Sequence, residues 1–313
     1  MSRLVTSSFL GRSHAHLASR SMVPVLSSFT ARHRLVTPIT TRYLSSTRIN
    51  NRDDKKDTTT HFGFKTVPEQ QKESLVHSVF ASVADNYDVM NDAMSMGVHR
   101  LWKNTLIERM SPTAETRLLD VAGGTGDIAL RFLDAVRQVE PNLGNAHVTV
   151  LDINEEMLRV GEKRFAAAGL EHSPHVAFVH GNAEVLDGIP DNSVDVYTIA
   201  FGIRNCTHID RVIAQAHRVL KRGGRFMVLE FGKVNNPILA TAYDQYSFRM
   251  IPHLGQILAN DRESYQYLVE SIRKFPSQPQ FAQMMRDGGF QTVGEGYEDL
   301  TFGVATIWSG WKL

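Results

Sequence analysis

Residues 118–127, Leu-Leu-Asp-Val-Ala-Gly-Gly-Thr-Gly-Asp, decide the fold of this 313-residue chain. They begin in a short apolar run, and Ile128, Phe132 and Val136 repeat at every fourth position after them. This pattern predicts a buried strand, a glycine turn and a helix with one buried face. Glycines let a backbone approach a ligand closely, and in an open α/β sheet such a turn lies where ligands bind. The stretch therefore predicts a binding site as well as a fold.

The same alternation of strand and helix patterns continues to residue 231, and it predicts a parallel sheet covered on both faces. The expected strands are 117–122, 147–151, 176–179, 194–201 and 225–231. Two later segments, 290–296 and 301–308, lie too close together for a crossover and predict an antiparallel hairpin. We expect an α/β fold, a Rossmann-like seven-stranded sheet that ends in this hairpin, with a helical cover over residues 236–267.

Polar residues follow successive strands of this expected sheet. Asp152 ends the second strand, where it would accept hydrogen bonds from both hydroxyls of a ribose. Asn182 and Ala183 follow the third strand, where the edge of an adenine would lie. The alternative is a purely structural glycine turn, with Asp152 as a helix cap. The order of these residues favours a cofactor that contains a nucleoside.

Two cofactors fit the glycine loop. Residues 124–129 satisfy the G-x-G-x-x-G/A pattern of dinucleotide sites, so an NAD-dependent oxidoreductase is one reading. However, Asp120 and Asp127 bracket the glycines, and their charge suits the sulfonium and ammonium of S-adenosylmethionine better than a pyrophosphate. The terminal hairpin favours the same cofactor, because it is typical of the methyltransferase sheet.

Several strings resemble the ubiquinone/menaquinone biosynthesis C-methyltransferase family, from about residue 64 to the C-terminus. They are Tyr-Asp-Val-Met-Asn-Asp at 87–92, Gly-Val-His-Arg-Leu-Trp-Lys at 97–103, the glycine loop, Gly-Asn-Ala-Glu at 181–184, Phe-Gly-Ile-Arg-Asn at 201–205, Leu-Glu-Phe-Gly-Lys at 229–233 and Tyr-Gln-Tyr-Leu-Val-Glu-Ser-Ile at 265–272. The first, fifth and last of these strings are the most specific. The resemblance implies a class I methyltransferase fold and transfer of a methyl group from S-adenosylmethionine to a ring carbon of a prenylated quinol.

The resemblance also implies a set of cofactor contacts. The expected contacts are Asp120, Gly124, Thr125, Gly126, Asp152, Asn182, Ala183 and Ala200. Many relatives have Ser at the position of Ala200, so a hydroxyl contact is absent here. Ubiquinone synthesis is the expected pathway, and menaquinol methylation, an NAD enzyme and a non-catalytic scaffold are the alternatives.

Acceptor activation is expected at three residues. Arg204 would stabilise the phenolate of the acceptor, Asn205 would hydrogen-bond a substrate oxygen, and the family implicates a Tyr at the position of Tyr87. An Arg stays protonated in proteins, so direct base action by Arg204 is disfavoured. The alternatives are a salt bridge for Arg204 and a packing role for Tyr87. His99 is either a general base or, more in keeping with its helical setting, a structural hydrogen-bonding group.

The first fifty residues have the composition of an organellar targeting sequence. They contain seven Arg and no Lys, Asp or Glu. This composition is typical of a transit peptide, and a disordered basic tail is the alternative. We expect a mitochondrial transit peptide over 1–44, a linker over 45–70 and one methyltransferase domain over 71–313. The family resemblance implies a peripheral protein on the matrix side of the inner membrane, in a complex with other ubiquinone-biosynthesis proteins.

Charge and cysteine content exclude other classes. The formal charge of +1 includes the arginine-rich start, so the remaining chain is acidic and unsuited to a nucleic-acid surface. Cys206 is the only cysteine, which rules out an internal disulfide and a cysteine-based metal cluster. No metal site is expected.

Residues 238–258 are rich in aromatic and aliphatic side chains. These side chains would line a channel for the prenyl tail, dock on a membrane or pack on the sheet.

Overall fold

The computed structural model describes residues 58–83, 91–92, 95–253, 256 and 261–313. The chain divides into two units, 1–53 and 54–313, and every described residue belongs to the second. The expected transit peptide and Tyr87 therefore lie outside the described residues.

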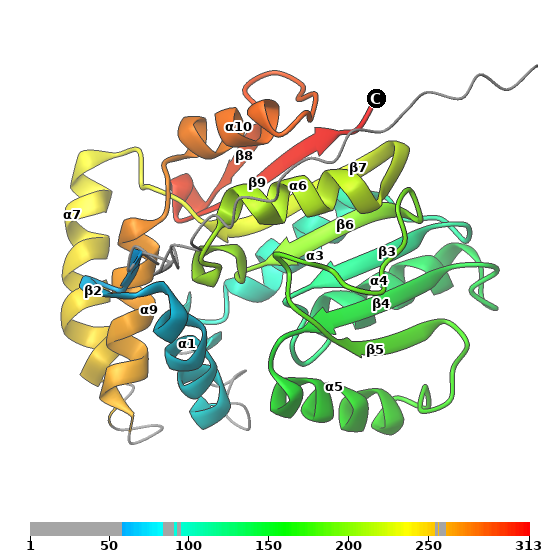
Figure 1. The fold of residues 1–313 in the computed structure, drawn as a ribbon, viewed down its shortest axis with the longest axis horizontal. Coiled ribbons are helices and arrows are strands. Elements are labelled where there is room, and N and C mark those ends of the chain that lie inside the picture. Colours follow the sequence, from blue (N-terminus) through cyan, green and yellow to red (C-terminus); the bar gives the residue numbers. More distant parts are fainter. Residues whose placement is uncertain (1–57, 84–90, 93–94, 254–255, 257–260) are drawn as a thin grey trace, which may run out of the picture. The chain divides into compact units, whose positions relative to one another are not determined.

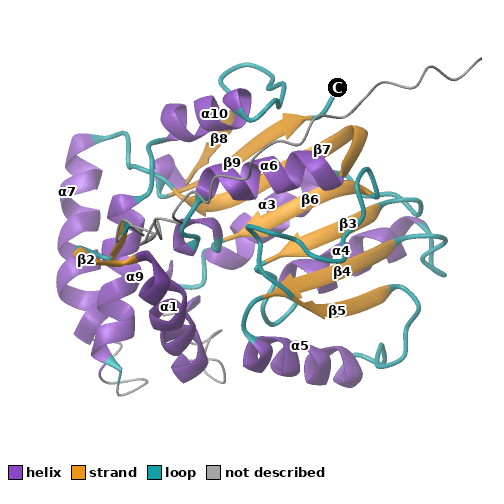
Figure 2. Ribbon diagram, viewed as in Figure 1, coloured by secondary structure: helices purple, strands orange, loops and turns teal. Residues whose placement is uncertain are grey.

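A seven-stranded sheet forms the centre of the second unit (Figure 2). The strand order is β5-β4-β3-β6-β7-β9-β8, and neighbours among the first five strands are parallel. The strands are β3 (Arg117–Val121), β4 (His147–Asp152), β5 (Val176–His180), β6 (Val194–Ala200), β7 (Leu220–Phe231), β8 (Tyr297–Leu300) and β9 (Ala305–Trp311). The α/β class and the five expected parallel strands are confirmed.

Two apolar clusters lie on opposite faces of this sheet, because side chains alternate along each strand. Leu118 belongs to one cluster and its neighbour Leu119 to the other. The helices of the first cluster are α3 (His99–Met110), α4 (Asp127–Val139) and α5 (Glu155–Ala167). Those of the second are α6 (Ile209–Val219) and α10 (Gln278–Asp287).

The C-terminal hairpin exists, but the prediction of its first strand was wrong. Residues 290–296 form no strand, and β8 begins only at Tyr297. The reason is local, since Gly294 and Gly296 have φ of +59° and +88°, which a strand cannot hold. β9 then lies between β7 and β8 and is antiparallel to both.

The expected linker is also corrected over its described part. β1 (Thr59–Phe62) and β2 (Lys65–Pro68) form an antiparallel hairpin, and α1 (Glu69–Val83) follows directly. The turn uses Gly63 at φ +57°. The hairpin is polar and none of its strand residues is fully buried, so its composition resembled that of a linker although its two strands pair along their length.

A helical cover lies beside the carboxyl ends of the parallel strands, as Figure 1 shows. It consists of α1, α7 (Pro237–Gln245), the π-helical turn η3 (Tyr246–Met250) and α9 (Arg262–Lys274). Ile251 packs with Tyr265, Leu268 and Val269 in a small core of its own. Among the described residues, no helix has the length and apolar character needed to cross a bilayer.

Candidate active site

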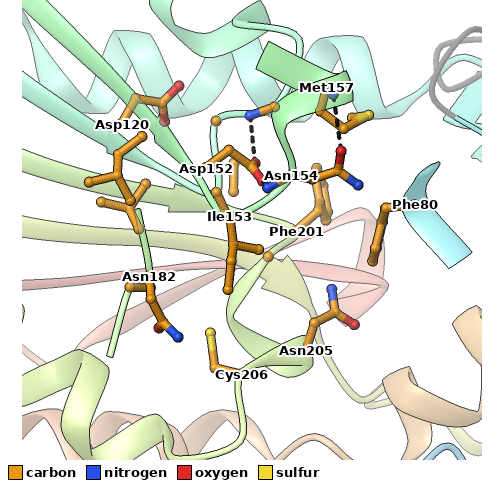
Figure 3. A pocket seen from close by; sticks show the side chains of 18 of the residues that line it. Phe80, Asp120, Asp152, Ile153, Asn154, Met157, Asn182, Phe201, Asn205 and Cys206 are labelled. Atoms are coloured by element: carbon orange, nitrogen blue, oxygen red, sulfur yellow. Dashed lines mark hydrogen bonds between the residues drawn. The ribbon is translucent and has the colours of Figure 1, made fainter. Parts of the chain in front are cut away.

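One pocket opens at the carboxyl ends of β3, β4 and β6 and encloses roughly 1150 Å³ including its mouth (Figure 3). The glycine loop forms one wall, and the turns after β4, β5 and β6 form further walls. Of the expected cofactor contacts, the pocket is lined by Asp120, Gly124, Thr125, Asp152, Asn182, Ala183 and Ala200.

The glycine loop has a conformation that other residues would not tolerate. Gly124 and Gly126 have φ of +51° and +75°. A Cβ added at Gly126 would lie 2.7 Å from Cε2 of Phe165, so this position requires glycine for packing. Gly126 is not among the lining residues, in contrast to its expected role as a direct contact.

Asp152 ties the glycine loop to the end of β4. Its Oδ2 accepts a hydrogen bond of 2.9 Å from the Gly124 amide, and its Oδ1 accepts one of 2.8 Å from the Asn154 amide. Burial raises the pKa of Asp152 to about 6, while these backbone donors oppose the rise. The cap of α5 is Asn154, whose side chain accepts from the amides of Glu156 and Met157. The alternative reading of Asp152 as a plain helix cap is therefore wrong.

Asp120 presents an unsatisfied acceptor to the pocket. Its side chain is buried, and Oδ1 accepts a hydrogen bond of 2.8 Å from the Thr198 hydroxyl. Oδ2 has no hydrogen-bond partner in the part of the chain that the structure describes. Burial raises the pKa of Asp120 to about 7. A buried carboxylate oxygen without a partner is costly, so a cationic ligand at this wall would relieve the cost.

Asp127 does not share this property. Its Oδ2 accepts from Nζ of Lys103 at 2.7 Å, and its Oδ1 accepts from Nε of Arg131 at 3.1 Å. Burial alone would raise the pKa of Asp127, but these two cations lower it below its ordinary value. Its charge is thus already compensated by the protein. The electrostatic argument for a cationic cofactor therefore rests on Asp120 alone.

Helix α1 supplies a wall that the sequence reasoning missed. Glu73, Val76, His77 and Phe80 line the pocket opposite the glycine loop. Nδ2 of the Asn182 side chain donates to Glu73 Oε2 at 3.4 Å, and its Oδ1 accepts a hydrogen bond of 2.8 Å from the backbone amide of Glu184. The spacing of Val76 and Phe80, four residues apart, is an ordinary helical spacing, and it does not say which wall of a pocket the helix forms.

The far end of the pocket is built by the residues that follow β6. Ala200, Phe201 and Asn205 line it, and Asn205 belongs to the short turn η2 (Ile203–Asn205). Phe201 has φ of +56°, an uncommon conformation for a bulky residue that is typical of functional sites. Asn205 Oδ1 accepts a hydrogen bond of 3.0 Å from the Tyr267 hydroxyl.

Arg204 forms the salt bridge that was its alternative reading. The guanidinium is 4% exposed, and its Nη1 lies 2.8 and 2.9 Å from the two carboxylate oxygens of the fully buried Glu230. The same nitrogen also donates to the Phe201 carbonyl. Arg204 is not among the residues that line the pocket. Its expected contact with an acceptor therefore stays a prediction.

His99 has the structural role that its helical setting favoured. Its Nδ1 lies 2.8 Å from the Ser95 hydroxyl, and the side chain does not line the pocket. Burial, followed by the charge of Lys103, lowers its pKa to about 4. The described residues contain no cluster of side chains suited to a metal ion.

The sheet and the pocket define a class of protein. A parallel sheet closed by an inserted antiparallel strand, with a glycine loop after β3, is the class I methyltransferase fold. A chain of the Haloferax volcanii complex between a methyltransferase activator and a methyltransferase has this fold with a TM-score of 0.51. It is 15% identical and covers 75% of this chain and 96% of its own length.

The sequence comparisons identify the family. The model of the ubiE/COQ5 methyltransferase family matches residues 44–312, and this chain belongs to that family. A relative from Bos taurus, a mitochondrial 2-methoxy-6-polyprenyl-1,4-benzoquinol methylase, is 48% identical over 98% of this chain and 96% of its own. The protein of that name from Schizosaccharomyces pombe is 56% identical over 81% and 84% of the two chains. The family resemblance of the sequence motifs is thereby confirmed.

Proposed function

We propose that this chain transfers a methyl group from S-adenosylmethionine to a ring carbon of 2-methoxy-6-polyprenyl-1,4-benzoquinol during ubiquinone synthesis. Relatives that share about half of its residues carry that activity in their names. The observation that carries the proposal is the pocket itself. It joins a glycine loop and an unpaired Asp120 at one end to the Asn205 amide at the other.

The residues present fit the proposed cofactor. S-adenosylmethionine supplies, when bound, a methyl group on a cationic sulfur that is a good leaving group, so no protein nucleophile is needed. Asp120 would hold its positive charge, because Oδ2 is the buried acceptor without a partner. Asp152 would face the ribose, and Asn182 and Ala183 the adenine. A pyrophosphate would instead place like charge against Asp120, which disfavours the NAD reading.

The chain must also activate the acceptor carbon, which supplies the electron pair of the new carbon–carbon bond. A phenolic hydroxyl has a pKa of about 10, and sharing or losing its proton moves electron density onto the ring. The Asn205 amide would donate to that oxygen. Holding the carbon in line with the methyl group can itself contribute several kcal/mol. We infer that Arg204, paired with Glu230, chiefly fixes the turn that carries Asn205.

The experiment uses the full chain, S-adenosylmethionine with a labelled methyl group, and a short-tailed 2-methoxy-6-prenyl quinol kept reduced. Label is expected in the quinol and not in the oxidised quinone, which serves as the matched control because it has no hydroxyl to activate. Faster labelling of a demethylmenaquinol would reassign the substrate. Cofactor binding without any label would indicate a scaffold, and NAD binding in place of S-adenosylmethionine would restore the oxidoreductase reading.

We infer a peripheral association with the matrix side of the mitochondrial inner membrane. We group five exposed apolar side chains of the cover and of the β1–β2 turn as one apolar patch: Phe64, Ile238, Leu239, Phe248 and Met250, which are 40–79% exposed. The rings of Phe64 and Phe248 stack with centroids 6.2 Å apart. Lys274 Nζ lies 5.9 Å from the Phe64 ring and Arg273 Cζ lies 5.7 Å from the Phe248 ring. Arg273 is also paired with Asp244, so Lys274 beside Phe64 is the cation that would face an anionic bilayer surface together with these apolar side chains.

This patch is tested by sedimentation with phosphatidylcholine–cardiolipin vesicles. The double variant Phe64→Ser/Ile238→Ser should reduce the bound fraction severalfold. Val293 is 78% exposed and lies outside the patch, so Val293→Ser is the matched control. Equal losses for the two variants would refute the assignment of this surface.

We propose that residues 1–44 are a mitochondrial transit peptide. The relatives are named as mitochondrial, and the family match begins at residue 44. Import into isolated mitochondria should shorten the chain near that residue and should fail when the six arginines of residues 1–44 are replaced by glutamine. Association with other ubiquinone-biosynthesis proteins would appear as co-purification from the same mitochondria.

A further inference from the structure

The side-chain amide of Asn205 has a defined orientation. Its Oδ1 is engaged by the Tyr267 hydroxyl at 3.0 Å. Figure 3 shows the amide nitrogen of Asn205 directed into the pocket and the oxygen directed away from it. The group that Asn205 offers to a ligand is therefore an N–H donor. A donor is the group required to stabilise an oxygen on which negative charge develops.

Tyr267 is held firmly enough to impose this orientation. It comes from α9, is 4% exposed, and stacks on the ring of Phe62 with centroids 4.1 Å apart and planes 16° from parallel. Burial raises the pKa of its hydroxyl above the ordinary value for Tyr, so the hydroxyl keeps its proton and can donate. The hydroxyl proton goes to Asn205 Oδ1, and this leaves the amide protons free for a ligand.

The N-terminal hairpin is part of the same arrangement. The Phe64 amide donates to Glu270 Oε2 at 2.9 Å, one turn of α9 beyond Tyr267. Gly63 packs against the Glu270 side chain, since an added Cβ would lie 3.0 Å from Glu270 Cβ, and its φ of +57° favours glycine at this turn. The hairpin thereby places Phe62 against Tyr267. A segment that looked like a linker thus supports the acceptor end of the pocket.

We propose that Tyr267 is a positioning residue, which fixes the Asn205 amide so that its N–H group faces the acceptor oxygen. The inference rests on the proposed function, since it assigns the role to a quinol oxygen. Without the Tyr267 hydroxyl, the amide is free to rotate and to present its carbonyl oxygen, which would repel a phenolate. Tyr267 itself touches no reacting atom, and its whole effect passes through Asn205.

The test compares Tyr267→Phe, which keeps the stacked ring, with Tyr265→Phe as the matched control. Tyr265 lies two residues earlier on α9, on the opposite side of the helix, and packs in the small core with Ile251. Tyr267→Phe should lower kcat for the quinol roughly tenfold and leave the Kd of S-adenosylmethionine unchanged, because loss of a fixed donor to a developing oxyanion is costly. Tyr265→Phe should change neither. In an Asn205→Ala background, Tyr267→Phe should cause no further loss.

A second readout does not depend on turnover. A short-tailed prenyl nitrophenol bound together with S-adenosylhomocysteine reports its own ionisation by absorbance. Tyr267→Phe should raise the apparent pKa of the bound phenol by about one unit, since a fixed donor favours the phenolate. Three results would overturn the positioning role. The pKa of the bound phenol could be unchanged, the phenol could fail to bind the wild-type chain, or Tyr267→Phe could lower kcat as much in the Asn205→Ala background as in the wild type. Absence of methyl transfer by the wild-type chain, with a normal shift of the phenol pKa, would overturn the proposed function alone.

Discussion

Asp120 should lower the stability of the ligand-free protein while it strengthens cofactor binding. Burial raises its pKa from 3.8 to about 7 in the folded chain. Each unit corresponds to about 1.36 kcal/mol, so the ionised side chain costs roughly 4 kcal/mol of folding free energy. Because the folded-state pKa is the higher one, the folded chain binds the extra proton between about pH 4 and pH 7. Stability falls as the pH rises through that window, and the cost is complete above it.

The variant Asp120→Asn separates these two effects. Asn keeps an oxygen for the Thr198 hydroxyl but removes the buried charge. The ligand-free variant should gain up to roughly 4 kcal/mol of unfolding free energy at pH 8 and less at pH 5, as measured by urea titration. Its affinity for S-adenosylmethionine should fall at least tenfold by calorimetry, since a charged hydrogen bond is lost. In the wild type, binding at pH 6 should be about tenfold weaker than at pH 8, because only the ionised form binds the cation.

Asp127→Asn is the matched control, and its stability change should have the opposite sign. The Asp127 carboxylate is paired with Lys103, which is 5% exposed, and removing it leaves that cation buried without compensation. The control should therefore lose stability at pH 8. The reasoning would be refuted if Asp120→Asn lost stability at pH 8, or if it bound S-adenosylmethionine as tightly as the wild type.

Three further changes test other parts of the structure. Arg204→Ala should lower the free energy of unfolding by about 3–5 kcal/mol, because it leaves Glu230 buried and unpaired. A drop in melting temperature with little loss of cofactor affinity per folded molecule would confirm this. An unchanged melting temperature with lost turnover would instead favour direct contact with the acceptor. Gly126→Ala should lower the melting temperature by several degrees, since the new Cβ would clash with Phe165 and φ is positive at this residue. A melting temperature equal to that of the wild type would contradict the packing role. Asn154→Ala should cost about 1 kcal/mol in urea unfolding through loss of the α5 cap, and no change would show that water replaces the cap.

The sequence predicts the sheet well because its physical signals are local. Buried parallel strands are short apolar runs, and the helices between them show a repeat of about four residues. The glycine loop at 118–127 is likewise a local signal. The first strand of the terminal hairpin was misplaced because the expected segment 290–296 ends in Gly294 and Gly296, whose positive φ stops any strand.

The site was predicted less completely because its electrostatics depend on residues distant in the chain. Asp127 looked like a free charge until α3 placed Lys103 against it, 24 residues away in sequence. Arg204 looked like a catalytic cation until β7 supplied Glu230. The partnership of Phe62, Tyr267 and Asn205 joins three segments that no periodicity connects. Such pairs become visible only once the fold brings the segments together.

The most direct test of the account is the position of the transferred methyl group. The full chain would be incubated with S-adenosylmethionine that carries a ¹³C methyl group and with the reduced short-tailed 2-methoxy-6-prenyl quinol, and the product would be examined by NMR. The account predicts one methyl group bonded to a ring carbon, with both quinol oxygens unmethylated. A methyl group on oxygen, or no transfer under conditions where S-adenosylmethionine binds, would contradict it.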